Sequence, residues 1–249
     1  MSAKALLITG ASRGIGRACA LLAAENGWSV GVNYREDAKA ADAVVETIAR
    51  SGGRAVALKG DVSVEADAIG MFDAAANALG PLTAVVANAG IVAPAARLAE
   101  MSAARMRRVV EVNVLGALLT AREAARRLAK SSGGAGGSIV LISSVAARLG
   151  SPNLYIDYAA SKGAVDTLTL GLAKELGPEG VRVNAVRPGM IETEIHIGGG
   201  DPDRARVLGA TSPLGRAGAA EEIAQAAIWL ISDAASYVTG ALIDVSGGR

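Results

Sequence analysis

Two short groups of residues in this chain have the types and spacing needed for chemistry. Tyr158 and Lys162 are four residues apart in a helix-like segment, so they share one helix face. A free phenol has a pKa of about 10, and a nearby ammonium favours phenolate, so the pair predicts a tyrosine that handles a proton near neutral pH. The glycine-rich turn Thr9–Gly16 follows an apolar run and opens a helix, a setting in which backbone N–H groups bind a pyrophosphate. Together they indicate hydride transfer with a nicotinamide cofactor.

Each group needs context, because either spacing can arise by chance. A chain of this composition contains a Tyr-x-x-x-Lys spacing about one time in ten, and Gly-x-x-x-Gly-x-Gly differs from the usual dinucleotide fingerprint. The context is that other predicted strands end in polar or glycine residues: Asp61-Val62, Asn88-Ala89-Gly90 and Arg187-Pro188-Gly189. Each could be turn chemistry alone, but together they share the edge at which open α/β sheets bind ligands.

The elements that must position these groups alternate along the chain. Short apolar runs predict strands near 5–9, 28–33, 54–58, 84–87, 138–143, 181–186 and 241–245. Amphipathic segments predict helices near 14–26, 37–51, 65–79, 100–130, 155–177 and 220–232. The alternation predicts an α/β fold, with one Rossmann domain over residues 1–249 and a doubly wound parallel sheet covered by helices on both faces. We take the glycine-rich stretch 131–137 as a long surface loop.

Composition narrows the class of protein. The net charge of +1 over 249 residues gives no reason to expect nucleic acid or an anionic membrane as partner. No apolar run approaches the ~18–20 residues of a membrane span, and no signal peptide is present, so we expect a cytoplasmic protein. Cys19 lacks an internal disulfide partner and predicts a buried thiol. The only histidine, His196, excludes His-rich metal sites, so we expect no metal and a solvent-exposed His196.

The end of the second predicted strand indicates which cofactor is bound. NAD-binding sheets place an acid here for the ribose 2′-OH, whereas an Arg accommodates the 2′-phosphate of NADP. In this chain Asn33 and Tyr34 end the strand, Tyr34 stands at the expected acid position, and Arg35 follows. Arg13 in the glycine turn adds a second guanidinium. Two cations and no carboxylate predict NADP(H), with NAD(H) less favoured; the alternative is a solvated Arg35 that pairs with an acid following it.

Three further polar residues complete the candidate chemical end. Ser144 follows the fifth strand, where its hydroxyl could polarise a carbonyl beside the tyrosine, while Ser143 points to the opposite face. Either serine could equally be a turn cap. Asn113 lies inside an apolar helix, where Asn is unfavourable and a buried amide needs partners. We therefore expect a functional role for Asn113.

These segments, in this order, resemble the short-chain dehydrogenase/reductase family in its small single-domain form. The resemblance covers essentially the whole chain and implies a seven-stranded sheet. It also implies a catalytic tetrad, in which Tyr158 is the general acid/base and Ser144 orients the substrate oxygen. Lys162 would hold the nicotinamide ribose and tune Tyr158, and Asn113 would anchor a water of the proton relay.

Cofactor contacts follow from the same motifs, with Thr193 expected at the carboxamide. The full set of expected cofactor-binding residues is Gly10, Ser12, Arg13, Gly14, Ile15, Gly16, Asn33, Tyr34, Arg35, Asp61, Val62, Asn88, Ala89, Gly90, Tyr158, Lys162, Pro188, Gly189, Ile191 and Thr193.

The substrate is a small carbonyl or alcohol whose identity stays open. The chain resembles both 3-oxoacyl-carrier-protein reductases and glucose dehydrogenases. However, Ser144 and Tyr158 are fourteen residues apart, one more than expected for the former, with the extra residue inside 151–157. A non-catalytic NADP(H)-binding regulatory protein is the alternative, and the intact Ser-Tyr-Lys set argues against it. Relatives pair the helices near 100–130 and 155–177, so we expect a homotetramer that covers Leu168, Leu170 and Leu172.

The late stretch 190–215 predicts a substrate loop. Glycines precede Asp201-Pro202, which we expect to cap and begin a short helix reaching about Leu208. A flexible hinge before a small helix is typical of a lid; a surface insertion without a role is the alternative.

Overall fold

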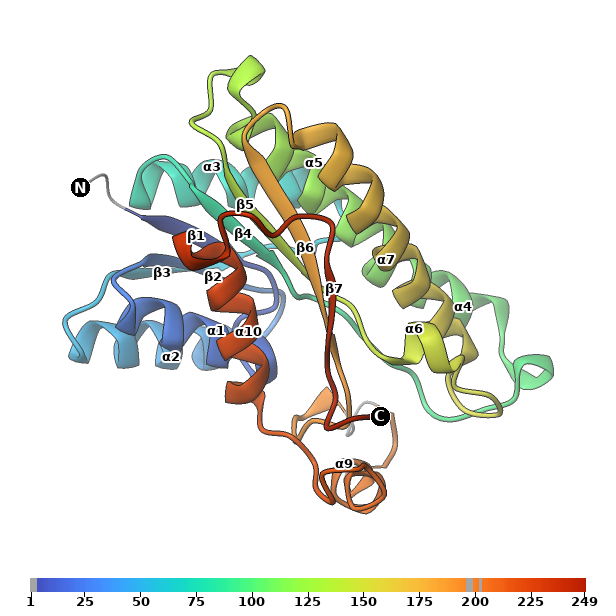
Figure 1. The fold of residues 1–249 in the computed structure, drawn as a ribbon. Helices are drawn as coiled ribbons and strands as arrows, with labels where there is room; N and C mark the ends of the chain where they lie inside the picture. Colours follow the sequence, from blue (N-terminus) through green and yellow to red (C-terminus); the bar gives the residue numbers. More distant parts are fainter. Residues whose placement is uncertain (1–3, 196–198, 202) are drawn as a thin grey trace.

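The computed structural model describes residues 4–195, 199–201 and 203–249, which form a seven-stranded parallel sheet (Figure 1). The strand order is β3-β2-β1-β4-β5-β6-β7, with every pair parallel. The predicted doubly wound α/β fold is therefore confirmed. The strands are β1 Ala5–Ile8, β2 Ser29–Tyr34, β3 Ala55–Lys59, β4 Ala84–Ala87, β5 Gly137–Ile142, β6 Val181–Pro188 and β7 Leu242–Val245.

Helices cover both faces of the sheet (Figure 1). Successive strand residues point to opposite faces, so Leu6 and Ile8 belong to the apolar cluster under α1, α2 and α10, and Leu7 belongs to the cluster under α3, α5 and α7. The helices are α1 Gly14–Glu25, α2 Ala38–Arg50, α3 Glu65–Leu79, α4 Ala103–Val110, α5 Gly116–Leu128, α6 Ala146–Leu149, α7 Ile156–Leu176, α9 Arg204–Gly209 and α10 Ala220–Ile231. None of the helices in the described ranges has the length and apolar character needed to cross a membrane.

The helix predicted near 100–130 is present as a helical path over residues 103–128, which a π-helical turn divides into two helices. The structure begins α4 after Ser102, whose hydroxyl caps it by accepting from the N–H of Arg105 at 3.2 Å. A π-helical turn, Glu111–Leu115, separates α4 from α5. Such a turn keeps the helical path but inserts a residue, so hydrophobic periodicity does not reveal it. Cys19 in α1 is buried as predicted, and burial raises the pKa of its thiol to about 12.

Two loop predictions also need correction. We predicted a long surface loop over 131–137, but the irregular part is shorter. Lys130–Ser132 forms a 3₁₀ turn, and Gly137 already pairs in β5. Helix α9 begins at Arg204 with Asp203 as its N-cap residue, so Asp201 does not cap it. Pro202 and His196 lie outside the described residues.

Candidate active site

The glycine turn after β1 is held by two amide side chains, those of the buried Asn33 and the half-buried Asn88. Asn33 accepts the N–H of Gly10 at Oδ1 (3.0 Å), and its Nδ2 donates to the carbonyls of Leu58 and Gly60, both at 3.1 Å. Asn88 at the end of β4 donates to the carbonyls of Thr9 (2.9 Å) and Gly10 (3.0 Å). Asn33 therefore positions the turn with its side chain, and it also lines the cavity in which we expected it to contact the cofactor.

The turn leaves room for a phosphate at the start of α1. Gly10 has a φ of +62°, which favours glycine, and a Cβ on Gly16 would overlap the carbonyl oxygen of Gly10. No acidic residue lies in the first turn of α1, and no side chain caps its N-terminus. The unpaired N–H groups and the helix dipole therefore face the cleft, an arrangement suited to a pyrophosphate.

The predicted ribose corner contains carboxylates as well as cations, which corrects the expectation of cations alone. Arg13 and Arg35 line the cavity, and so do Glu36 and Asp37. Arg35 pairs with the exposed Glu36 at 2.6 Å, while Asp37 accepts the N–H of Ala40 as the N-cap of α2. The Arg35–Glu36 pair is the alternative that the sequence left open, a solvated Arg35 paired with an acid that follows it.

Asp61 and Tyr34 have other partners than expected. The Asp61 carboxylate accepts from Ser63 N–H (2.9 Å), Ser63 Oγ (2.6 Å) and Arg108 (3.1 Å). Burial raises the pKa of Asp61, but these bonds outweigh burial and lower it below its usual value. Tyr34 packs against the core beside α1 and α2. Neither side chain lines the cleft, whereas Val62 does.

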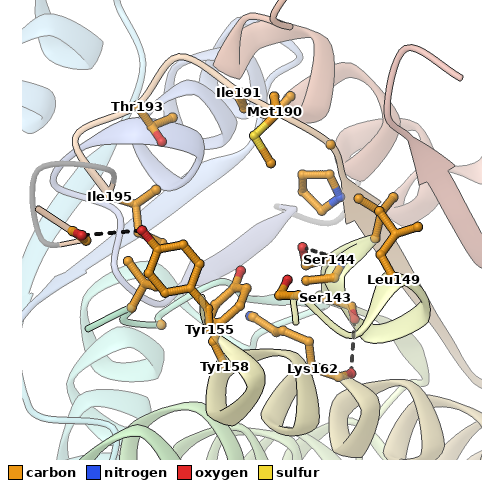
Figure 2. A pocket seen from close by; sticks show the side chains of 18 of the residues that line it. Ser143, Ser144, Leu149, Tyr155, Tyr158, Lys162, Met190, Ile191, Thr193 and Ile195 are labelled. Atoms are coloured by element: carbon orange, nitrogen blue, oxygen red, sulfur yellow. Dashed lines mark hydrogen bonds between the residues drawn. The ribbon is translucent and has the colours of Figure 1, made fainter. Parts of the chain in front are cut away.

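The predicted catalytic side chains meet above the end of β5. In Figure 2, Tyr158, Lys162 and Ser144 project into the same pocket, facing Thr193 and Met190 of the late loop. Ser144 accepts the N–H of Ala146 at 3.1 Å, which leaves its hydroxyl proton available inside the pocket that it shares with Tyr158. Lys162 Nζ donates to the carbonyl of Ile142 at 2.7 Å and lies 5.7 Å from the centre of the Tyr158 ring.

Burial dominates the acid–base properties of this pair. It raises the pKa of the Tyr158 phenol, and the hydrogen bond with Ser144 partly lowers it. Burial lowers the pKa of Lys162 to about 8, while the charge of Asp166 opposes that shift. The expected lowering of the Tyr158 pKa by Lys162 is therefore not found, because the ammonium lies over the ring and donates to the carbonyl of Ile142.

The π-helical turn places Asn113 behind the catalytic residues. Its Oδ1 accepts the N–H of Ile91 at 2.8 Å, and its Nδ2 donates to the carbonyl of Ile91 (2.9 Å) and to Ser161 Oγ (3.0 Å). Ser161 in turn donates to the carbonyl of Tyr158 at 2.6 Å. The buried amide is thus paired, as its burial requires, and it ties the segment after Gly90 to α7.

Sequence reasoning missed a second polar cluster, which lies one helical turn beyond Lys162. Asp166 is buried and accepts from Ser143 Oγ at 2.7 Å and from Arg187 Nη2 at 2.7 Å. Arg187 also lies 3.6 Å from Asp244 of β7. The available signal was an acid on the same face of α7 as Tyr158 and Lys162, at the i, i+4 spacing.

Two cavities form one continuous cleft along the carboxyl ends of the strands. Their volumes are about 490 Å³ on the Tyr158 side and about 290 Å³ on the Arg35 side. They share five lining residues: Ile15, Asn88, Gly90, Thr193 and Ile195. Other expected residues that line the cleft are Gly10, Ser12, Arg13, Gly14, Asn33, Val62, Ala89, Pro188, Gly189 and Ile191. The cleft therefore suits a long, partly anionic molecule beside a smaller one.

Known proteins are similar to this chain over nearly its full length. The family described as Enoyl-(Acyl carrier protein) reductase matches residues 10–249. The uncharacterized oxidoreductase YgfF of Escherichia coli is 51% identical, with 98% of both chains covered. L-rhamnose 1-dehydrogenase (NAD(P)(+)) of a Sphingomonas strain is 38% identical, covering 100% of this chain and 96% of its own. A short-chain type dehydrogenase/reductase from Mycobacterium marinum superposes with a TM-score of 0.92 at 38% identity, over 98% and 94% of the two chains.

Proposed function

Because the chain belongs to the short-chain dehydrogenase/reductase family, we propose that it interconverts a carbonyl and a secondary alcohol with NADP(H), with Tyr158 as general acid/base. Its relatives act as oxidoreductases on CH–OH groups of small molecules, and so does this protein. The observation that carries the finer proposal is the cavity in which the Tyr158 phenol, the Ser144 hydroxyl and the buried Lys162 meet.

The roles of the side chains follow from their placement. In carbonyl reduction, Tyr158 Oη gives its proton to the substrate oxygen, and in alcohol oxidation it takes that proton back. Ser144 donates to the same oxygen and holds it beside Tyr158. Lys162 lines the same pocket with its ammonium beside the Tyr158 ring, where it would bind the cofactor. A bound nicotinamide supplies the hydride for reduction and accepts it in oxidation.

Residues around the cleft fit a dinucleotide. The N–H groups at the start of α1 would hold the pyrophosphate, and Gly90 and Lys162 would hold the nicotinamide ribose. Preference for NADP(H) is supported by Arg13 and Arg35, which line the cleft where a 2′-phosphate would lie. Arg35 would exchange Glu36 for that phosphate, whose greater charge makes it the stronger partner. We assign residues 1–249 to one domain, since both apolar clusters rest on the same sheet.

The test measures NADPH oxidation with a panel of ketones and aldehydes. Tyr158→Phe removes only the phenol oxygen, so we expect turnover to fall by ~10²–10⁴ while NADPH binding, followed by fluorescence, stays near that of the parent protein. Tyr155→Phe is the matched control and should lose far less. Near-normal turnover in Tyr158→Phe would refute the assignment, and NADPH binding without turnover of any carbonyl by the parent protein would favour a regulatory role.

A further inference from the structure

The substrate side of the cleft is apolar but carries positive charge. Its wall is formed by Leu149, Pro152, Leu154, Met190 and Ile195. The charged residues among the described lining residues are Lys162, Arg204 and Arg249, and none of those lining residues is Asp or Glu. A neutral polyhydroxylated substrate would leave hydroxyl groups facing this apolar wall without partners, at a cost for each.

Of these three cations, Arg204 is the one whose side chain has no hydrogen-bond acceptor among the residues that the structure describes. It is the first residue of α9, it is half-buried, and its guanidinium carbon lies 4.8 Å from the centre of the Tyr155 ring. Tyr155 is itself buried, and its hydroxyl donates to the carbonyl of Gly199 at 3.3 Å. The ring fixes one face of the guanidinium by a cation–π contact and leaves the N–H edge for a ligand.

The other cations nearby have partners in the protein. Lys162 donates to the carbonyl of Ile142 at 2.7 Å, and Arg249 Nη1 donates to the carbonyl of Leu208 at 3.4 Å. On α9 itself, Arg206 pairs with Asp203 at 3.3 Å and is exposed. Within the ranges that the structure describes, no carboxylate pairs with Arg204. A half-buried guanidinium of this kind is stabilised by an anion that binds beside it.

We propose that the physiological substrate is an apolar ketone or alcohol that carries a carboxylate, and that Arg204 binds this carboxylate. The proposal rests on the proposed function, because it names the substrate of the same reaction. A carboxylate suits this position, because the planar N–H edge of one guanidinium matches two carboxylate oxygens and its single positive charge balances the single negative charge. Arg204 is thus a specificity residue, with Tyr155 as its support.

The test compares levulinate and its longer homologues, each paired with its carboxamide, as substrates for NADPH oxidation. The two members of a pair have the same shape and differ in charge. We expect the parent protein to prefer the best keto acid over its amide by about tenfold or more in kcat/KM. Arg204→Gln should abolish that preference, because it lowers turnover of the acid far more than turnover of the amide, and Arg204→Lys should keep part of the preference. Arg206→Gln, on the same helix, is the control and should keep all of it.

The outcomes separate this proposal from the proposed function. Equal turnover of acids and amides by the parent protein, or an equal loss for both in Arg204→Gln, overturns the anion site while leaving the oxidoreductase assignment intact. If no compound is turned over, binding of the same acids and amides in the presence of NADP⁺, measured by calorimetry, decides. If the parent protein binds the acid more tightly than the amide and Arg204→Gln removes that difference, the site is supported. Equal binding of acid and amide by the parent protein overturns it.

Discussion

At the scale of single residues, Lys162 keeps a positive charge in a place that disfavours it. Burial alone lowers the pKa of its ammonium, and the charge of Asp166 opposes that shift, leaving the value at about 8. Asp166 is held in place by Ser143 at 2.7 Å and by Arg187, whose Nε donates at 3.0 Å. Asp166 therefore acts on the reaction through Lys162 and is a positioning residue, not a catalytic one.

Replacing Asp166 should change the pH dependence of the reaction. Asp166→Asn removes the charge that raises the pKa of Lys162, so this pKa should fall further below its ordinary value. The ammonium form is then lost at lower pH, and the alkaline fall of kcat/KM should move to lower pH by several tenths of a unit or more. The measurement is a pH profile of NADPH-dependent turnover of the best ketone.

The control for this change is Asp244→Asn. Asp244 also lies near Arg187, at 3.6 Å, but it does not contribute to the pKa of Lys162. Its pH profile should match that of the parent protein. Identical profiles for Asp166→Asn and the parent protein would show that the buried acid has only a structural role.

Cofactor choice should depend on the two arginines at the ribose corner. Arg35→Ala and Arg13→Ala should each weaken NADPH binding more than NADH binding, by about tenfold, because only NADPH carries the 2′-phosphate. Glu36→Gln should have the opposite effect, since it frees Arg35 from its 2.6 Å ion pair. Dissociation constants for both cofactors, measured by fluorescence titration, test this. Equal losses of affinity for NADPH and NADH would mean that the arginines do not bind the 2′-phosphate.

At the scale of elements, local patterns predicted the architecture but not the pairings between distant segments. Alternating apolar runs located all seven strands, and the turn motif identified the N-terminus of α1, because both signals are contained in a few neighbouring residues. The π-helical turn at Asn113 and the cluster around Asp166 depend on contacts with segments far along the chain. The spacing of Tyr158 and Lys162 predicted that the two side chains share one helix face. Their pKa values are set by burial, which depends on the packing of the whole fold.

The late loop is the element expected to respond to ligands. Glu192 N–H donates to the carbonyl of Gly218 at 2.9 Å, which anchors one end, and α9 is anchored by the buried Ala205 and Gly209. Thr193 and Ile195 between these anchors line both cavities, so a ligand would contact them from either side. We expect stronger amide hydrogen-exchange protection over residues 190–210 with NADP⁺ and a substrate analogue together. Equal protection with and without these ligands would contradict a lid.

At the scale of the whole molecule, the outer surface of α5 and α7 carries exposed apolar residues. Leu118 and Leu170 are 44% and 43% exposed, and Leu115 in the adjoining π-helical turn is 42% exposed. The two helices lie along the same side of the sheet (Figure 1). Of the leucines named from the sequence, Leu168 and Leu172 are half-buried and pack against the core, so Leu170 is the one that this surface exposes. Clustered exposed leucines of this kind mark surfaces that associate with another copy.

A homotetramer would cover this surface, and light scattering can test it. The mass in solution should be near 100 kDa, about four times the 24.9 kDa of one chain. Leu118→Asp combined with Leu170→Asp places charges where apolar contacts are expected, so the mass should fall to that of a dimer or monomer while circular dichroism stays unchanged. Val207→Asp, at an apolar residue of α9 that is 54% exposed, is the control and should keep the parent mass. A parent protein with the mass of one chain would refute the assembly. An unchanged mass in the double variant would show that the subunits associate through another surface.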